Sequence, residues 1–299
     1  MPNMRQQFVT TLFEVMKQDD RVVLLLGDIG VHGFKNVFAE LPKRIYNIGI
    51  LEQTTIGAAA GLAIRGLVPV VHTIAPFLVE RAYEQLKDDF GYQELNGNFV
   101  SVGASYDYAG LGCTHHCPGD VGILKNIPNM DIIVPGTAKE FDTLFKAAYQ
   151  KNNPTYYRLS ETSNTTDQKV VFGKGLIVKK GKMATIIAVG PMLQKVMDAT
   201  ADMDMTVLYY TTIAPFDSGL IRKVMKTQPN QHVIICEPYY EGVLAFDVAS
   251  ALAPKQAKID HIGVPHKFLN NYGTVTENDK GLGLDTAGIR KKVLAFLKK

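Results

Sequence analysis

The chain has 299 residues, of which 46% are hydrophobic and 20% are charged, and its formal net charge at pH 7 is +3. This length accommodates two α/β domains, and so small a net charge gives no reason to expect a nucleic-acid-binding protein. The sequence contains no apolar run long enough to span a membrane and no signal-peptide core near its start, so we expect a cytoplasmic protein.

The cysteine content agrees with a reducing compartment. Cys113, Cys117 and Cys236 are an odd number of cysteines, which favours free thiols over a disulfide framework. Cys113 and Cys117 flank His115 and His116, an arrangement that invites a zinc hypothesis. Zinc usually takes ligands from two separated groups, and no second group is present. We therefore expect no metal ligand in this chain.

Apolar runs alternate with amphipathic stretches through the first half of the chain. The spacing of apolar residues predicts helices at 5–17, 34–41, 51–65, from 76 onward, at 120–127 and at 139–151. Buried strands are predicted at 21–28, 45–48, 67–73, 98–104, 131–134 and 155–159. Regular alternation of strand and helix indicates a doubly wound, mainly parallel sheet, in a domain over residues 1–165.

A second α/β unit follows a polar, glycine-punctuated segment, which we interpret as a linker over 166–182 with a short hairpin-like part. Strands are predicted at 184–189, 205–210, 232–237 and 258–263, and helices at 191–203, 218–226, 242–252 and 286–296. The fold class predicted for the chain is therefore α/β, with two doubly wound domains, the second over 183–299.

Glu52 and Asp28 are the first candidate site residues. Glu52 begins a helix whose next residues are small, and a carboxylate there is either a solvated helix-start acid or a buried acid with a raised pKa. Asp28 follows a buried strand, at the edge where open α/β sheets bind ligands, although a turn-forming aspartate is an equal alternative. The glycine-rich segment 105–120 is long for a connecting loop, which favours a functional role.

Several motifs resemble the pyrimidine-binding domain of thiamine diphosphate enzymes of the transketolase type. They are IGILEQTTIGAAAGLAIRGLVPVVHT, PFLVERAYEQ, GCTHHCPGD and IPNMDIIVPG, in this order along the chain. The resemblance extends from about residue 5 to the end, and the chain is similar to the C-terminal half of full-length transketolase, or to the C-terminal subunit of a split one. The second domain then corresponds to the small C-terminal domain of that family.

The resemblance implies thiamine diphosphate as cofactor and assigns its contacts. Such an enzyme needs an acid at the pyrimidine N1′, so that the 4′-imino nitrogen can deprotonate the thiazolium carbon. Glu52 matches this acid and Phe77 the ring that stacks on the pyrimidine, while Asp28 and Ile74 are further expected contacts. Without the resemblance, a core phenylalanine is the better interpretation of Phe77.

The resemblance also implies residues for the substrate. His115 matches the histidine that faces the thiazolium and the donor sugar, and a neutral imidazole can exchange protons with an alkoxide. His116 is the weaker candidate, and His72 either approaches the cofactor or is a core histidine. Basic positions that meet the substrate phosphate or its polar tail in relatives correspond to Arg158, Arg81 and Arg5.

Two departures from the family pattern concern the sugars. Many transketolases have an acid four residues before the active-site histidine, where this chain has Leu111, with Asp107 as the nearest acid. Cys113 stands where many relatives have proline. An unusual sugar phosphate or a specialised pathway is compatible with these differences.

The chain lacks the Gly-Asp-Gly signature that, in this superfamily, holds magnesium and the diphosphate. Gly27-Asp28-Ile29 and Gly119-Asp120-Val121 are the nearest matches, and neither has the third glycine. We therefore expect a partner subunit that carries the diphosphate-binding domain and holds Mg²⁺, in a heterotetramer with two copies of each chain. The small-residue helix after Glu52 is a plausible surface for this partner.

These observations lead to one main hypothesis and several alternatives. We expect the C-terminal subunit of a split transketolase, which transfers a two-carbon ketol unit between sugar phosphates. A deoxyxylulose phosphate synthase-like enzyme and the beta subunit of a 2-oxo acid dehydrogenase share much of the signature. The alternative that is not an enzyme is a non-catalytic partner-binding module that kept the fold.

Overall fold

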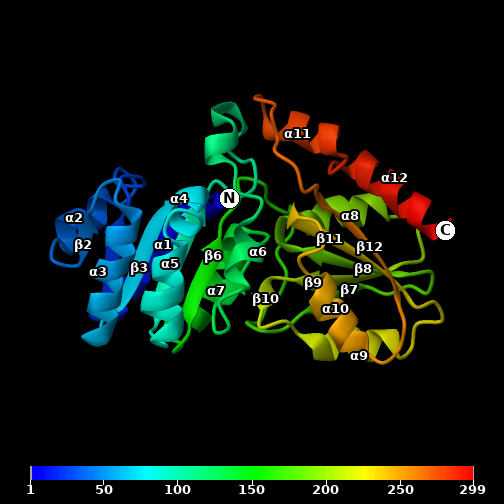
Figure 1. Cartoon of the computed structure of the whole chain (residues 1–299), viewed down its shortest axis with the longest axis horizontal. Helices are drawn as coiled ribbons and strands as arrows, with labels where there is room; N and C mark the ends of the chain where they lie inside the picture. The colour runs from blue at the N-terminus through cyan, green and yellow to red at the C-terminus, as the bar shows by residue number, and fades with distance from the viewer. Residues whose placement is uncertain (1, 299) are drawn as a thin grey trace.

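Two mainly parallel β-sheets, one from each half of the chain, form the framework of the computed structural model, which describes residues 2–298 (Figure 1). The first sheet has the strand order β10-β5-β6-β4-β3-β1-β2, and the second has the order β12-β11-β8-β9-β7. Helices cover the faces of both sheets. The predicted fold class is confirmed.

The first half alternates strands and helices as predicted. Its helices and strands are α1 (Met4–Gln18), β1 (Val22–Leu26), α2 (Lys35–Glu40), β2 (Ile45–Asn47), α3 (Glu52–Ile64), β3 (Val68–Ile74), α4 (Ala75–Val79), α5 (Tyr83–Gln85), the π-helix η1 (Leu86–Tyr92), β4 (Gly97–Val102), the 3₁₀ turns η2 (Ala109–Leu111) and η3 (Cys113–His115), α6 (Asp120–Leu124), β5 (Asp131–Ile133), α7 (Ala138–Ala148) and β6 (Pro154–Arg158). Every residue of β1, β4 and β6 is buried, as expected for strands covered by helices on both faces.

The second half repeats this arrangement around a smaller sheet. Its elements are β7 (Leu176–Lys179), β8 (Thr185–Val189), the 3₁₀ turn η4 (Gly190–Met192), α8 (Leu193–Ala199), β9 (Thr206–Tyr210), β10 (Thr212–Ala214), α9 (Ser218–Met225), β11 (His232–Tyr240), α10 (Ala245–Leu252), β12 (Lys258–Val264), α11 (Val275–Leu282) and α12 (Thr286–Leu297). Helix α11 was not predicted from the sequence, because it is short and few of its residues are buried.

Two strands differ from the sequence-based expectation. β7 lies inside the segment 166–182 that we expected to be a linker, where it pairs antiparallel with β9. β10 leaves the second half and joins the edge of the first sheet, antiparallel to β5. Both strands are short, and β7 is only partly buried, so neither has the continuous apolar run that marks a buried strand.

The long helix expected from residue 76 onward is also interrupted. Residues 80–82 form a turn between α4 and α5, and the chain continues as the π-helix η1. At its other end, α4 follows β3 without a connecting loop. Helix α4 therefore begins at the carboxyl end of β3, next to the ends of β1 and β4.

The two halves are joined by two apolar clusters, each with buried residues from both halves, and by several buried hydrogen bonds. The Tyr209 hydroxyl donates to Glu140 Oε2 at 2.6 Å, and the Asn164 amide donates to the Gly190 carbonyl at 3.0 Å. A Cβ at Gly136 would lie 2.1 Å from the Asn164 amide nitrogen, so only glycine fits at this contact. The second half is therefore fixed against the edge of the first sheet.

Candidate active site

The carboxyl ends of β1, β3 and β4 meet at one edge of the first sheet, because these strands pair in parallel. Three chain segments leave from this edge: the turn after β1, helix α4 after β3, and the loop after β4. The loop, residues 103–119, carries both histidines of the Cys-Thr-His-His-Cys motif and is called the His115 loop below. Ligands of open α/β sheets bind at such an edge.

Glu52 is buried at the first residue of α3, with 3% of its side chain exposed. Buried small residues, Ala59 and Ala60, allow this helix to pack closely on the sheet. The Arg81 guanidinium donates to Glu52 Oε2 at 2.8 Å, and 40% of the arginine side chain is exposed. A carboxylate removed from water in this way needs such a partner.

Phe77 and His115 lie beside this ion pair. The Arg81 guanidinium carbon is 4.2 Å from the centre of the Phe77 ring, and the His115 ring meets Phe77 edge to face at 5.2 Å between centroids. Glu52, Arg81, Phe77 and His115 thus form one contiguous group, called the Glu52 cluster below. The cluster joins segments that are far apart in the sequence.

Tyr108 is a neighbour of the cluster that sequence reasoning missed. Its ring centre is 6.5 Å from that of His115, and the Thr114 hydroxyl lies 3.0 Å from His115 Nδ1. The only sequence signal for Tyr108 was an aromatic residue in the same glycine-rich loop as His115. A mixed aromatic and polar lining is typical of cofactor sites.

Asp28 and Ile74 lie at the same sheet edge but make different contacts. Asp28 has a left-handed backbone (φ 59°), and it exchanges two hydrogen bonds of 3.0 Å with the side chain of Asn47. Ile74 is the last residue of β3 and lies close to Gly103, at the start of the His115 loop. Asp28 therefore has a turn-stabilising role in the structure, and cofactor contact by either residue stays a prediction.

His72 is completely buried in β3. Its Nδ1–H donates to the Val100 carbonyl at 2.8 Å, while Nε2 has no partner, and its ring packs on Phe8 at 4.9 Å between centroids. Burial lowers the pKa of His72 to about 4, so the imidazole is neutral near pH 7. The structure thus gives His72 the contacts of a core histidine at the wall of a cavity.

Arg5 lies at the start of α1, between two cavities of about 320 Å³ each. The first cavity is bounded by His72, His32 and the turn at Gly30. The second is bounded by Glu161 and by Tyr108, the neighbour of His115. Arg5 is therefore an exposed cation within reach of space that adjoins the Glu52 cluster.

Arg158 does not have the position that we expected of a substrate contact. Only 1% of its side chain is exposed, Nε donates to Asp120 Oδ2 at 2.7 Å, and Nη2 donates to Ser105 Oγ at 2.8 Å. Burial opposes its charge, but the Asp120 carboxylate raises the pKa of Arg158 further above its usual range. We therefore leave Arg158 out of the substrate contacts proposed below, since its donors already hold the protein together.

The other residues of the His115 loop are divided between surface and interior. Leu111 and Cys113 are exposed, whereas His116 is buried, and burial lowers its pKa. Asp107 is turned inward and accepts from the backbone N–H groups of Ala104 and Glu161. Burial raises the pKa of Asp107 to about 7. Asp107 is thus a structural acid that does not take the place of the missing acid at Leu111.

The two cysteines of this loop are free thiols with different surroundings. Cys117 is buried, and its thiol lies 3.5 Å from Glu80 Oε1, while Cys113 faces outward. Within residues 2–298, His, Cys, Asp and Glu side chains do not gather into a group that could hold a metal ion.

Comparison with known families identifies the family of both halves of the chain. The family model described as transketolase, pyrimidine binding domain, matches residues 1–166, and the model described as transketolase, C-terminal domain, matches residues 173–289. The chain belongs to the transketolase family. The family resemblance in the motifs around Glu52 and His115 is thereby confirmed.

Two relatives are matched over nearly their whole length, and a third over about half of its length. An uncharacterized 33.6 kDa protein in the fasciation locus of Rhodococcoides fascians is 36% identical over 97% of this chain and 93% of its own. An apulose-4-phosphate transketolase subunit of Phocaeicola vulgatus is 30% identical over 99% of this chain and 97% of its own. 1-Deoxy-D-xylulose-5-phosphate synthase of Aeromonas hydrophila is 31% identical over 99% of this chain but only 48% of its own.

Solved transketolase structures share the fold. A structure described as a split gene transketolase, inactive beta4 tetramer, superposes with a TM-score of 0.85 at 24% identity and covers 99% of this chain and 98% of its own. Transketolase from Campylobacter jejuni gives a TM-score of 0.83 at 15% identity, covering 98% of this chain and 46% of its own. Among residues 2–298, no helix combines the length and apolarity needed to span a bilayer.

Proposed function

We propose that this chain is the C-terminal subunit of a split transketolase, which moves a two-carbon ketol unit between sugar phosphates with thiamine diphosphate as cofactor. The observation that carries the proposal is the Glu52 cluster, in which Arg81 links a buried carboxylate to an aromatic ring that contacts an imidazole. Two full-length relatives support it, because each is described as a separate subunit or split-gene chain.

The residues of the cluster suit the pyrimidine half of thiamine diphosphate. The buried Glu52 carboxylate would form the hydrogen bond to the pyrimidine N1′ once Arg81 has released it. The half-buried ring of Phe77 would stack on the pyrimidine. When bound, the cofactor supplies a nucleophilic carbon that takes up and passes on the ketol unit.

Arg81 occupies part of the space that this arrangement requires. Its guanidinium bonds the Glu52 carboxylate and covers one face of the Phe77 ring. Glu52 therefore has to exchange Arg81 for the cofactor, and the exposed arginine side chain has room to move. Once released, Arg81 is a cation next to the site, as expected for a contact with an anionic substrate.

His115 and Arg5 are the residues that we propose for substrate chemistry. The His115 ring contacts Phe77 and is partly exposed. His115 would therefore exchange a proton with the hydroxyl or alkoxide oxygen of a sugar bound next to Phe77. Arg5 would bind the phosphate at the far end of the sugar, in the cavities that it lines. His72 and His116 stay weaker predictions, because both are buried.

A partner chain is part of the proposal. We propose that an N-terminal subunit carries the diphosphate-binding domain and holds Mg²⁺, and that two copies of each chain form a heterotetramer. Helix α3 has a small, open position at Gly61, and the exposed apolar residues Ile50, Leu51 and Ile64 lie at its two ends. We also propose a cytoplasmic location, in keeping with the free thiols.

The test is reconstitution with the N-terminal subunit, identified by co-purification. We expect two-carbon transfer between a ketose phosphate and an aldose phosphate only when both chains, thiamine diphosphate and Mg²⁺ are present. Tight binding of thiamine diphosphate and turnover by the isolated chain would contradict the proposal. Decarboxylation of a 2-oxo acid without ketol transfer would point instead to the dehydrogenase beta subunit.

One alternative reaction has an observation in its favour. The relationship to 1-deoxy-D-xylulose-5-phosphate synthase extends over 99% of this chain. Such an enzyme joins the two-carbon acyl unit of a 2-oxo acid to an aldose phosphate and releases CO2. The same reconstituted complex assayed with pyruvate and glyceraldehyde 3-phosphate therefore separates the two reactions. Ketol transfer without this condensation is the result that we expect.

A further inference from the structure

The His115 loop is closed at its base by a short bridge. The Cys117 N–H donates to the Ser105 carbonyl at 2.7 Å, and the two residues pair antiparallel outside the main sheet. Residues 106–116 therefore form an excursion whose direction depends on how its two ends are held. His115 lies near the end of this excursion, where a small rotation of the base would move the imidazole away from Phe77.

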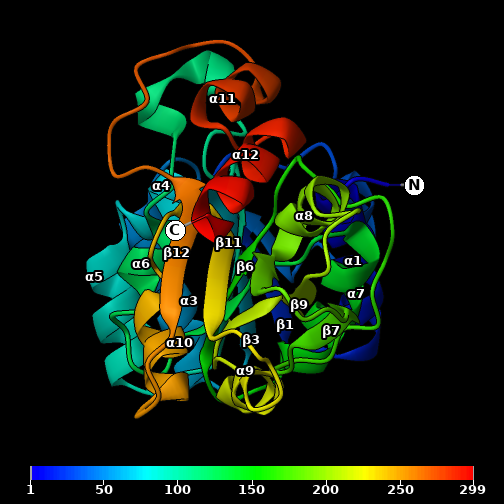
Figure 2. The same ribbon diagram turned by 90° about the vertical axis from the view of Figure 1, so that its right-hand side faces the viewer.

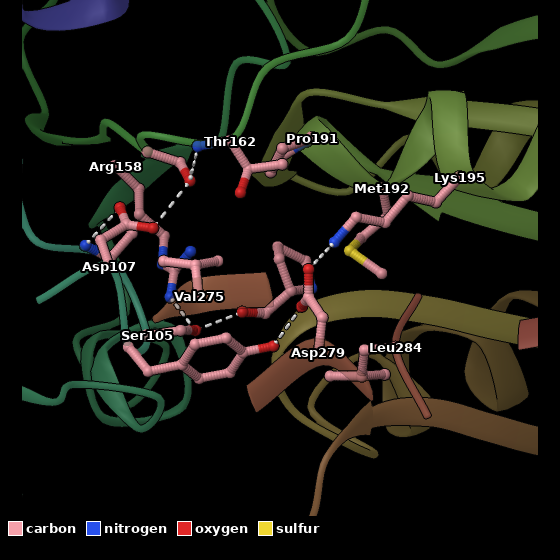
Figure 3. A pocket seen from close by; sticks show the side chains of 14 residues that line it. Ser105, Asp107, Arg158, Thr162, Pro191, Met192, Lys195, Val275, Asp279 and Leu284 are labelled. Carbon is pink, nitrogen blue, oxygen red and sulfur yellow. Dashed lines mark hydrogen bonds and ion pairs between the residues drawn. The ribbon is translucent and has the colours of Figure 1, made fainter. Parts of the chain in front are cut away.

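The first end of the loop is held by two helices of the C-terminal half. The Tyr106 hydroxyl donates to Asp279 Oδ1 on α11 at 2.7 Å, and Lys195 on α8 lies 2.6 Å from Asp279 Oδ2. Figure 3 shows the Lys195 and Asp279 side chains, both from the C-terminal half, pointing toward one another. Hydrogen bonds to a charged partner are among the stronger ones in proteins.

Further contacts from the C-terminal half hold both ends of the loop. Ser105 Oγ donates to the Pro238 carbonyl and accepts from Arg158. At the other end, the Tyr240 N–H donates to the Pro118 carbonyl at 2.8 Å. Figure 2 shows the tip of the loop beside α11 and the segment before it, where a Cβ at Gly112 would lie 2.7 Å from the Tyr272 ring.

Water cannot easily replace the hydrogen bond between Tyr106 and Asp279, because both residues are buried. Burial together with the Asp279 charge raises the pKa of the Tyr106 hydroxyl, which stays a hydrogen-bond donor. Without this hydroxyl, the first residue after the bridge would keep its apolar contacts but would lose its directional link to α11. The loop would then be free to rotate about its base.

From this geometry we propose that Tyr106 and Asp279 are positioning residues for the His115 loop, through which the C-terminal half places the His115 imidazole against Phe77. The inference rests on the function proposed above, in which His115 acts on the sugar. It assigns to the small C-terminal domain a part in catalysis besides assembly.

A pair of matched tyrosine variants tests the proposal. Tyr106→Phe removes the bond to Asp279, and Tyr209→Phe removes an equivalent buried bond, from the Tyr209 hydroxyl to Glu140, which does not contact the loop. In the reconstituted complex we expect Y106F to lower kcat about tenfold, with a smaller change in KM. We expect Y209F to retain kcat while losing a similar amount of thermal stability.

A second measurement reports on the loop without an activity assay. Hydrogen exchange of the isolated chain is expected to be faster over residues 106–116 in Y106F, and unchanged there in Y209F. Asp279→Asn keeps an oxygen that can accept from Tyr106 but loses the ion pair with Lys195, so its effects are expected to be intermediate.

The two measurements distinguish the possible failures. A wild-type complex without ketol transfer contradicts the proposed function, while hydrogen exchange still decides whether Tyr106 holds the loop. Equal kcat and equal protection of residues 106–116 in Y106F and Y209F would overturn the positioning role. Equal kcat with faster exchange in Y106F would also overturn it, because a loosened loop would then have no effect on the reaction.

Discussion

Two buried glutamates, one in each half of the molecule, differ in the kind of hydrogen-bond partner that they have. Glu237, in β11 of the second sheet, accepts hydrogen bonds from the backbone N–H groups of Gly242 and Leu244 at 2.6 and 3.3 Å. Burial raises its pKa to about 8. Glu52, next to the first sheet, is also buried, but it is paired with the side chain of Arg81.

The difference lies in how easily the partner can be replaced. Backbone N–H groups in a folded loop cannot leave, so the Glu237 carboxyl fastens the turn between β11 and α10. A partly exposed arginine can swing away, so the Glu52 carboxylate is able to exchange its partner for a ligand. Glu52 therefore has a replaceable side-chain partner, as the proposed function requires, whereas Glu237 has fixed backbone partners.

The largest effect is expected from replacing the Glu52 carboxylate by an amide. Glu52→Gln is expected to lower kcat for ketol transfer by about 10²-fold or more, because general acid–base contributions have this size. Glu237→Gln, the matched control, is expected to retain kcat within about threefold, because Glu237 accepts its hydrogen bonds from backbone N–H groups of the turn after β11. Both variants are assayed in the reconstituted complex.

Equal activities of E52Q and E237Q would remove the basis of this comparison. Full activity of E52Q would in addition leave the non-catalytic module as the better interpretation of the fold.

The second prediction concerns the pH dependence of stability. The folded-state pKa of Glu237, about 8, lies above its ordinary value of 4.5, so its contribution is complete below pH 4.5 and is lost as the pH rises through 8. From about pH 5 to about pH 7.5, wild type is expected to lose about 3 kcal/mol relative to E237Q. Urea unfolding of both chains at the two pH values measures this difference.

Parallel pH profiles for wild type and E237Q would mean that Glu237 is ionised in the folded chain. The contrast between a fixed neutral acid and an exchangeable carboxylate would then be lost.

The smallest effect is expected at Arg81. Arg81→Gln removes the group that the cofactor has to displace from Glu52, so half-saturation of the reconstituted complex is expected at an about threefold lower thiamine diphosphate concentration. Arg65→Gln, at the other end of α3, controls for the lost charge. Weaker cofactor binding in R81Q than in R65Q would show that Arg81 assists the cofactor rather than competing with it.

Much of the fold was predictable because its signals are local. The run VVLLL over β1 and the alternation of strand and helix are properties of adjacent residues, and they predicted the doubly wound sheets. β10 was not predictable in this way, because a strand of this length is stable only through its pairing with β5. The buried ion pair between Arg158 and Asp120 was also not predictable, because the sequence around an arginine does not show whether its side chain is buried.

By itself, the sequence determined the α/β architecture and the membership of the transketolase family, since the periodicity of apolar residues and the order of the motifs can be read directly from it. Only the tertiary structure decided that Arg81 bonds Glu52, that Arg158 is buried and that Tyr106 reaches Asp279. These contacts join residues that are distant in sequence. They depend on how sheets and helices pack, which no local pattern of residues specifies.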